Sequence, residues 1–178
     1  GDVPVWTKEI NQDFAQFGYS VSTAGDVNGD GLSDIIVGAN LLDNGQAGEG
    51  GAFVYHGSVD APPQTANWTV DSDQAGAWLT AAGGGVGDVN GDGYQDVMVA
   101  AGKYDTATLA DAGKAWLYNG SASGLEDTAS WNAEGTQVNG QFGSNAWPAG
   151  DVNGDGYGDV LMTTAYDNPE VDEGVAFL

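Results

Sequence analysis

An acidic phrase of nine residues occurs three times in this chain of 178 residues. It occupies residues 26–34, 88–96 and 151–159 and reads Asp-Val-Asn-Gly-Asp-Gly, then Leu or Tyr, a variable residue and Asp. The three copies begin 62 and 63 residues apart. A nearly constant period of this length indicates that the chain is built from copies of one structural unit.

Each copy carries four short apolar, aromatic or β-branched segments bounded by glycine, and these predict β-strands, twelve in all. The tryptophan segments start at Trp6, Trp68 and Trp131, the aromatic-led segments at Phe17, Trp78 and Phe142, the apolar runs after the loops at Ile35, Val97 and Val160, and the fourth segments at Gly51, Lys114 and Val175. Thirty glycines and the lack of a helical period favour an all-β protein. We therefore define repeat copies 6–67, 68–130 and 131–178 within a single propeller segment, 1–178.

Four antiparallel strands in about 62 residues, repeated, predict the four-stranded blades of a β-propeller, three of them in this chain. The apolar runs predict strands covered on both faces, and the more polar tryptophan segments predict outer edge strands. A calcium-stabilised β-solenoid is the alternative, but its repeats are much shorter. Because propellers close with about four to eight blades, we expect part of a six- or seven-bladed ring. The chain is then either a fragment of a longer propeller or one half of a homodimer.

The acidic phrase has the chemistry of a calcium-binding loop. Positions 1, 3, 5 and 9 offer side-chain oxygens, position 7 offers its carbonyl, and glycines at positions 4 and 6 allow a tight left-handed turn. An all-oxygen ligand set without His or Cys argues against zinc and copper, and Mg²⁺ prefers more water ligands. The predicted ligands are Asp26, Asn28, Asp30, Leu32 and Asp34; Asp88, Asn90, Asp92, Tyr94 and Asp96; and Asp151, Asn153, Asp155, Tyr157 and Asp159. We expect three structural Ca²⁺ ions, one per repeat.

The charge of the chain excludes several classes of partner. There are 26 acidic residues against three lysines and no arginine, for a net charge of −23. Nucleic acid is excluded as a partner because almost nothing can neutralise its phosphates. No apolar run approaches the 18 residues or so of a membrane-spanning helix, so direct membrane insertion is not expected.

The motifs resemble a known family. Phe17-Gly18, the acidic loop and then Gly38-Ala39 resemble the FG-GAP repeat of integrin α-subunit propellers, which also occurs in bacterial and fungal extracellular proteins, including some lectins. The resemblance covers all three copies. The second copy has Trp78-Leu79 in place of Phe-Gly and one extra residue in 83–85, and the third ends its apolar run in Thr163-Thr164. The resemblance implies calcium loops that stiffen each blade and an extracellular or cell-surface location.

The segments between the third and fourth strands vary most between copies, at 40–50, 102–113 and 165–174. Variable loops on a constant scaffold are where recognition usually occurs. We therefore expect a module for extracellular adhesion, ligand binding or assembly, with a protein or glycan ligand. The alternatives are a carbohydrate-binding lectin and a fragment of a propeller enzyme whose active site lies outside this chain. No catalytic constellation recurs with the repeat, so we expect no enzymatic activity in this chain.

Overall fold

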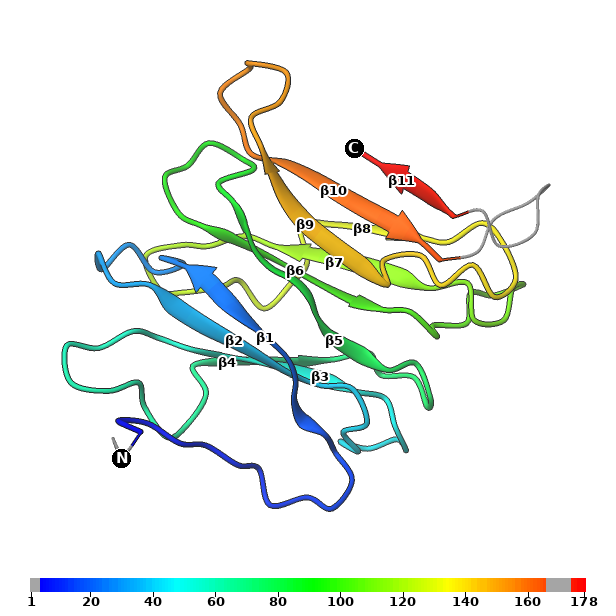
Figure 1. Cartoon of the computed structure of the whole chain (residues 1–178), viewed down its shortest axis with the longest axis horizontal. Coiled ribbons are helices and arrows are strands. Elements are labelled where there is room, and N and C mark those ends of the chain that lie inside the picture. Colours follow the sequence, from blue (N-terminus) through cyan, green and yellow to red (C-terminus); the bar gives the residue numbers. More distant parts are fainter. Residues whose placement is uncertain (1–3, 166–173) are drawn as a thin grey trace.

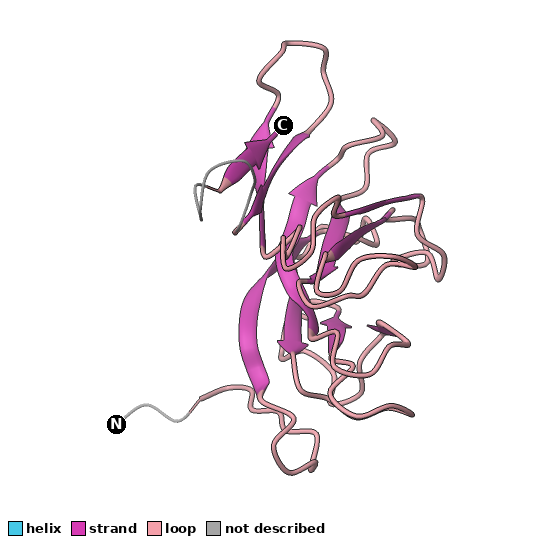
Figure 2. Ribbon diagram, turned by 90° about the vertical axis from the view of Figure 1, so that its right-hand side faces the viewer, coloured by secondary structure: helices cyan, strands magenta, loops and turns pink. Residues whose placement is uncertain are grey.

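The computed structural model describes residues 4–165 and 174–178, and in these residues the chain forms strands and loops without a helix (Figures 1 and 2). The strands are β1 (Phe17–Gly25), β2 (Asp34–Ala39), β3 (Gly51–Tyr55), β4 (Trp68–Asp71), β5 (Leu79–Gly87), β6 (Asp96–Ala101), β7 (Lys114–Tyr118), β8 (Trp131–Glu134), β9 (Asn145–Gly150), β10 (Asp159–Thr164) and β11 (Val175–Phe177). Most of the variable segment 165–174 lies outside the described residues.

The strands form three antiparallel sheets, which are the blades of a β-propeller. Their orders are β1-β2-β3-β4, β5-β6-β7-β8 and β9-β10-β11, so the third sheet has three strands within the described residues. The strand that begins each sheet lies innermost, since β5 packs against β1 on one side and β9 on the other. The prediction of an all-β propeller with antiparallel blades is confirmed.

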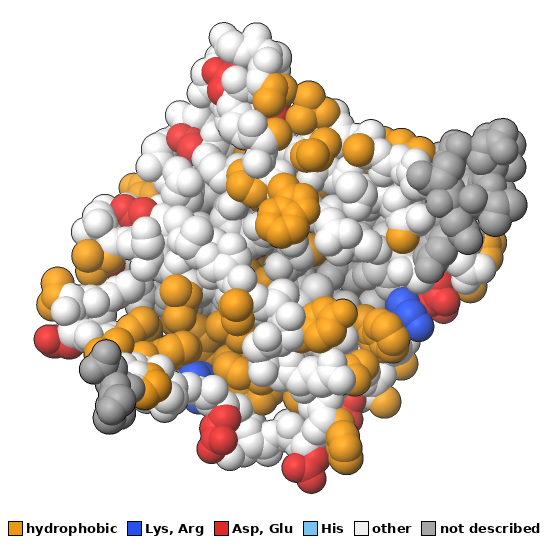
Figure 3. All heavy atoms as spheres, viewed as in Figure 1, with side chains coloured by type: hydrophobic (Ala, Val, Ile, Leu, Met, Phe, Trp, Pro, Cys, Tyr) orange, Lys and Arg blue, Asp and Glu red, His pale blue; other side chains and the backbone are white. Residues whose placement is uncertain are grey.

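Two hydrophobic cores hold the sheets together. One joins the first and second sheets and includes Ile36, Leu79 and Val97, and the other joins the second and third sheets and includes Met98 and Ala146. Strands β2 and β6 are almost entirely buried, as their unbroken apolar sequences predict. On the face shown in Figure 3, hydrophobic side chains gather centrally and most acidic ones lie at the periphery.

Consecutive glycines in β5 allow the inner strands to approach each other closely. A Cβ on Gly84 would lie 2.6 Å from Ser22 Cβ, and one on Gly85 would lie 2.6 Å from the Ala24 backbone. On the other side, a Cβ on Gly83 would lie 3.1 Å from Ala146 Cβ. Side chains at these positions would push the three blades apart.

The sheets are offset from the sequence copies. The tryptophan segment β4 pairs with β3, and β8 pairs with β7, so each of these two sheets takes its outer strand from the following copy. The prediction that these segments are edge strands is confirmed for β4 and β8. The segment at Trp6 is not a strand, but its ring packs edge-on against Tyr55 with centroids 5.2 Å apart, as Trp68 packs against Tyr118 at 4.8 Å.

The second copy aligns differently from our expectation. Leu79 pairs with Ala101 just as Phe17 pairs with Ala39, so Leu79 and not Trp78 takes the place of the repeat phenylalanine. Strands β1 and β5 then have the same nine-residue length, and the extra residue expected in 83–85 is not present. The expectation was wrong because it aligned the copies by their aromatic residues. The strand register instead places the buried Leu79 at the position of the phenylalanine, and Trp78 is left partly exposed.

Candidate metal centres

The three acidic loops occupy the same place in each blade. Residues 26–34, 88–96 and 151–159 connect the first strand of a sheet to the second. Because corresponding strands run in the same direction in each sheet, the loops lie along one side of the molecule, at the upper left in Figure 1. Three candidate metal centres therefore lie at one end of the blades.

Each loop wraps around its first aspartate. Asp26 Oδ1 accepts a hydrogen bond from Asp30 N at 3.0 Å, and its Oδ2 accepts one from Gly31 N at 2.9 Å. Asp88 and Asp151 accept the corresponding bonds in the other two loops. Glycine at position 4 has a φ of 72°, 76° and 78° in the three loops, a left-handed conformation that other residues adopt only with strain.

The oxygens at positions 1 and 3 lie next to each other. Asn28 Oδ1 accepts a hydrogen bond from Asp30 N at 2.9 Å, and this is the same N–H that donates to Asp26 Oδ1. The Asp30 carboxylate accepts from Leu32 N through Oδ1 and from Asn28 Nδ2 through Oδ2. The side-chain oxygens of positions 1, 3 and 5 are therefore gathered inside one turn of the backbone.

The aspartate at position 9 anchors the loop to its blade. Asp34 is fully buried, and its Oδ2 and Oδ1 accept hydrogen bonds from Val27 N at 2.9 Å and Gly57 N at 2.7 Å. Asp96 is likewise buried and accepts from Val89 N and Gly120 N. Sequence reasoning assigned these carboxylates only to the metal. It missed their second role, which ties the acidic loop to the connection that follows the third strand.

Burial raises the pKa of Asp96, and this effect outweighs the hydrogen bonds from Gly120 N and Val89 N, which lower the pKa. The neighbouring charges of Asp92 and Asp88 raise the pKa further. These like charges repel, and a bound divalent cation would favour the ionised carboxylates.

Consecutive loops are also bonded to each other. Gln95 N donates to Asp26 O at 3.1 Å, and Gly158 N donates to Asp88 O at 2.9 Å. The side chains at position 7 add a second link. A Cβ on Gly29 would lie 2.7 Å from Tyr94 Cε1, and a Cβ on Gly91 would lie 2.6 Å from Tyr157 Cε1. The loop motif predicts a role only for the main-chain carbonyl at position 7, although the aromatic residue found there in two copies was a signal of packing.

The donor set fits a calcium ion, with part of the coordination left to water. No three His, Cys, Asp or Glu side chains in residues 4–165 and 174–178 come together as a cluster that would hold a metal by themselves. Each loop instead combines two carboxylates and an asparagine oxygen within one turn, with a carbonyl at position 7 and a further carboxylate at position 9, which is buried in the first two loops and partly exposed in the third. Ca²⁺ takes six to eight oxygen ligands and accepts carboxylate, amide, carbonyl and water oxygens together.

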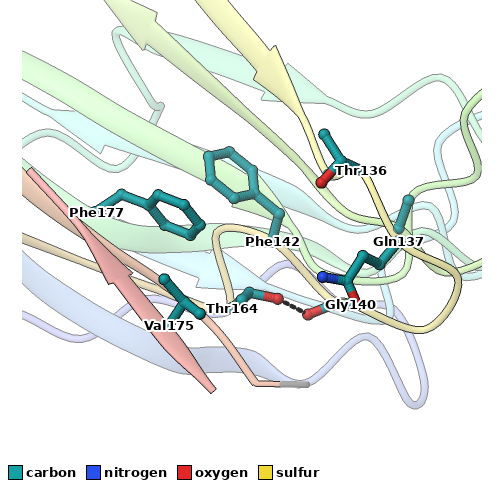
Figure 4. Close-up of a pocket in the computed structure, with 9 residues that line it drawn as sticks. Thr136, Gln137, Gly140, Phe142, Thr164, Val175 and Phe177 are labelled. Atoms are coloured by element: carbon teal, nitrogen blue, oxygen red, sulfur yellow. Dashed lines mark hydrogen bonds between the residues drawn. The ribbon is translucent and has the colours of Figure 1, made fainter. Parts of the chain in front are cut away.

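A separate cavity of about 250 Å³ lies beside β11 (Figure 4). Phe142 and Phe177 line it with their rings 5.7 Å apart, and Thr164 Oγ1 donates a hydrogen bond to Gly140 O. None of the residues found to line this cavity is titratable, so it offers no catalytic candidate.

Comparison with known proteins gives consistent matches. The family model for the FG-GAP repeat matches residues 17–55 and 80–118. Integrin alpha-4 of Xenopus laevis is 31% identical over 150 residues, which is 82% of this chain and 14% of that protein. Human integrin alpha-6 is 31% identical over 159 residues, covering 86% of this chain and 13% of that protein. Integrin alpha pat-2 of Caenorhabditis briggsae is 37% identical over 101 residues, covering 54% of this chain and 8% of that protein. The chain thus spans less than a sixth of the length of these relatives.

Proposed function

This chain belongs to the FG-GAP repeat family of integrin α-like β-propellers, and from that premise we propose that it is an extracellular module for adhesion or ligand binding whose blades are stabilised by Ca²⁺. The similar proteins are integrin α chains, and our proposal of a binding module without enzymatic activity follows them. No helix in the described part of the chain is long and apolar enough to cross a membrane.

The observation that carries the calcium proposal is the common hydrogen-bond pattern of the three acidic loops. In each loop the first aspartate is held by two loop N–H groups, so its oxygens are already directed into the turn. Bound Ca²⁺ would supply positive charge to offset the repulsion between the carboxylates. The role is structural because each predicted ligand set belongs to one loop.

The proposal is tested by metal-dependent stability and stoichiometry. A ligand present at 100 times its dissociation constant stabilises the folded state by about 2.7 kcal/mol per site. We expect a chelator to lower the melting temperature measured by circular dichroism, and isothermal titration calorimetry to give three Ca²⁺ per chain. Asp30→Ala, Asp92→Ala and Asp155→Ala should each remove one equivalent. An unchanged melting temperature in the chelator would overturn the calcium proposal.

We also propose that the ring is completed by further blades, either from a second copy or from a longer chain. The three sheets formed by the described residues are fewer than the roughly four to eight that close around an axis. Light scattering of the chain in Ca²⁺ distinguishes a dimer from the monomer mass of 18.1 kDa. A stable folded monomer would contradict the dimer.

A further inference from the structure

A second cavity, of about 190 Å³, lies at the end of the blades opposite the acidic loops. It is lined by residues of all three repeats, among them Tyr19, Asn40, Trp78, Thr80, Lys103 and Gln141. Asn40 follows β2 and Lys103 follows β6, whereas the acidic loops precede these strands. None of the lining residues is acidic, in a chain that carries 26 acids and three lysines. This cavity is therefore electrostatically unlike the chain as a whole.

Three residues of the cavity are positions where the second repeat departs from the others. By the register of β1 and β5, Trp78 corresponds to Gln16, Thr80 to Gly18 and Lys103 to Leu41. The residue before the repeat phenylalanine in the third copy is again glutamine, Gln141. All three departures line the same cavity.

Trp78 is not required by the scaffold. Gln16, Trp78 and Gln141 have φ values of 55°, 62° and 50°, so the left-handed conformation belongs to the repeat and not to the tryptophan. Large side chains are uncommon in this conformation. The Trp78 side chain is 39% exposed, and the neighbouring Leu79 fills the core instead. A tryptophan at this position is better explained by a contact at the protein surface than by packing in the hydrophobic core.

Trp78 positions a lysine that has no carboxylate partner. Lys103 Nζ lies 3.8 Å from the centroid of the Trp78 ring, a cation–π contact. Within the described residues Lys103 makes no ion pair, whereas Lys114 pairs with Glu134 at 2.9 Å. An ammonium group held on a ring and surrounded by no acid in its cavity is suited to receive an anion.

Asn40, which lines the same cavity, carries an unsatisfied hydrogen-bond acceptor. Asn40 is 5% exposed, and its Oδ1 has no hydrogen-bond partner within the described residues. A buried acceptor without a donor is costly, so a ligand that donates to it gains affinity. A carboxylate alone supplies no such donor, but a hydroxyl group does. The cavity is therefore suited to a ligand that carries both a carboxylate and hydroxyl groups.

We propose that this cavity binds one carboxylated sugar residue of a glycan, with the carboxylate at Lys103 and a hydroxyl group donating to Asn40 Oδ1. The volume is below the range of roughly 300–1,000 Å³ typical of drug-sized ligands, and so suits a single ring. The inference rests on the proposed ligand-binding function and supplies its ligand class. It does not involve the acidic loops.

The test is a titration of the folded, Ca²⁺-loaded chain with methyl glucuronide, methyl glucoside and acetate, followed by NMR. We expect the glucuronide to bind at least about tenfold more tightly than the other two, because only it offers the carboxylate and the hydroxyl groups together. Lys103→Leu and Trp78→Gln, which introduce the residues of the first copy, should each weaken glucuronide binding at least about tenfold. Lys8→Gln removes the same charge outside the cavity and should leave binding unchanged.

Several outcomes would overturn the inference. Equal binding of glucuronide and glucoside would remove the role of Lys103, and equal binding of acetate would reduce the site to a general anion site. Tighter binding of an acidic peptide, lost in the same variants, would assign the cavity to a protein ligand. Absence of glucuronide binding to a chain that still shows three Ca²⁺ and a calcium-dependent melting temperature would reject the sugar while leaving the proposed module intact.

Discussion

The two ends of the blades differ in how strictly the repeat is kept. At the acidic end, six consecutive residues are identical in all three loops and the first aspartate accepts the same hydrogen bonds in each. At the opposite end, equivalent positions hold Gln16 or Trp78, and Leu41 or Lys103. The comparison indicates that the repeated end maintains the scaffold and that the divergent end carries recognition.

The repeated end is constrained because its loops depend on one another. Gln95 N bonds to Asp26 O of the preceding loop, and the Tyr94 ring covers Gly29. A change in one loop therefore affects the next one as well as its own blade. Neighbouring blades are also bonded at the opposite end, where Trp78 N donates to Gly48 O at 3.3 Å and the Ser20 and Thr80 hydroxyls bond to each other. There, however, the side chains of Tyr19, Asn40 and Gln141, which line the cavity, make no hydrogen bond within the described residues.

The largest expected effect at the repeated end comes from Asp96→Ala. This substitution leaves Val89 N and Gly120 N without their acceptor. Each orphaned donor costs about 1–3 kcal/mol, so we expect a loss of about 2–6 kcal/mol in the free energy of unfolding. The measurement is urea denaturation in the presence of a chelator, which separates the anchoring role from metal binding.

The exposed Asp60 provides the control for this anchor, because its carboxylate makes no hydrogen bond in the described structure. Asp60→Ala should change the free energy of unfolding by less than about 0.5 kcal/mol. Equal denaturation midpoints for Asp60→Ala and Asp96→Ala would disprove the anchoring role.

An intermediate effect is expected from Gly29→Ala, with Gly154→Ala as an internal control. Both glycines have a φ above 70°, so both substitutions pay a backbone cost of about 1–2 kcal/mol. Only at Gly29 does the new Cβ also displace the Tyr94 ring, whereas Gly154 has no atom within 4 Å. We expect Gly29→Ala to lose about 1–3 kcal/mol more than Gly154→Ala in thermal denaturation.

Gly91→Ala should behave like Gly29→Ala, because its Cβ meets Tyr157 in the same way. If all three alanine variants lose the same stability, the contact between consecutive loops contributes nothing and the loops act as independent units.

The smallest effect on stability is expected at the divergent end, from Trp78→Gln. Glutamine occupies this position in the other two copies, and the main loss is a cation–π contact worth about 0.5–1 kcal/mol at an exposed site. Leu79→Ala, one residue away but buried, should cost about 2–5 kcal/mol. A Trp78→Gln variant as unstable as Leu79→Ala would show that Trp78 serves the scaffold instead of a ligand.

Much of the fold could be predicted because local sequence patterns are strong in this chain. The apolar runs of β2 and β6 identify strands buried on both faces, and glycine spacing defines the turns. The local patterns do not specify how distant segments pair. Trp68 begins a new copy in sequence, yet it joins the sheet of the preceding copy because its partner strand is β3.

The candidate sites show the same limit. The spacing of Asp26, Asn28 and Asp30 predicts a metal loop directly, since all its donors lie within a few residues. The anchoring bond from Gly57 N to Asp34 and the contact of Lys103 with Trp78 were not foreseen, because they join residues 23 and 25 positions apart. Such contacts depend on how strands pair and not on the local pattern.

The sequence by itself determined the repeated unit, its strands and the oxygen-rich loops, because turn conformation and strand propensity depend on neighbouring residues. The tertiary structure alone decided which copy supplies each outer strand, how the acidic loops are linked to one another, and that three departures of the second repeat meet in one cavity. These features arise from packing and hydrogen bonds between segments distant in the chain, whose proximity is set only when the blades assemble.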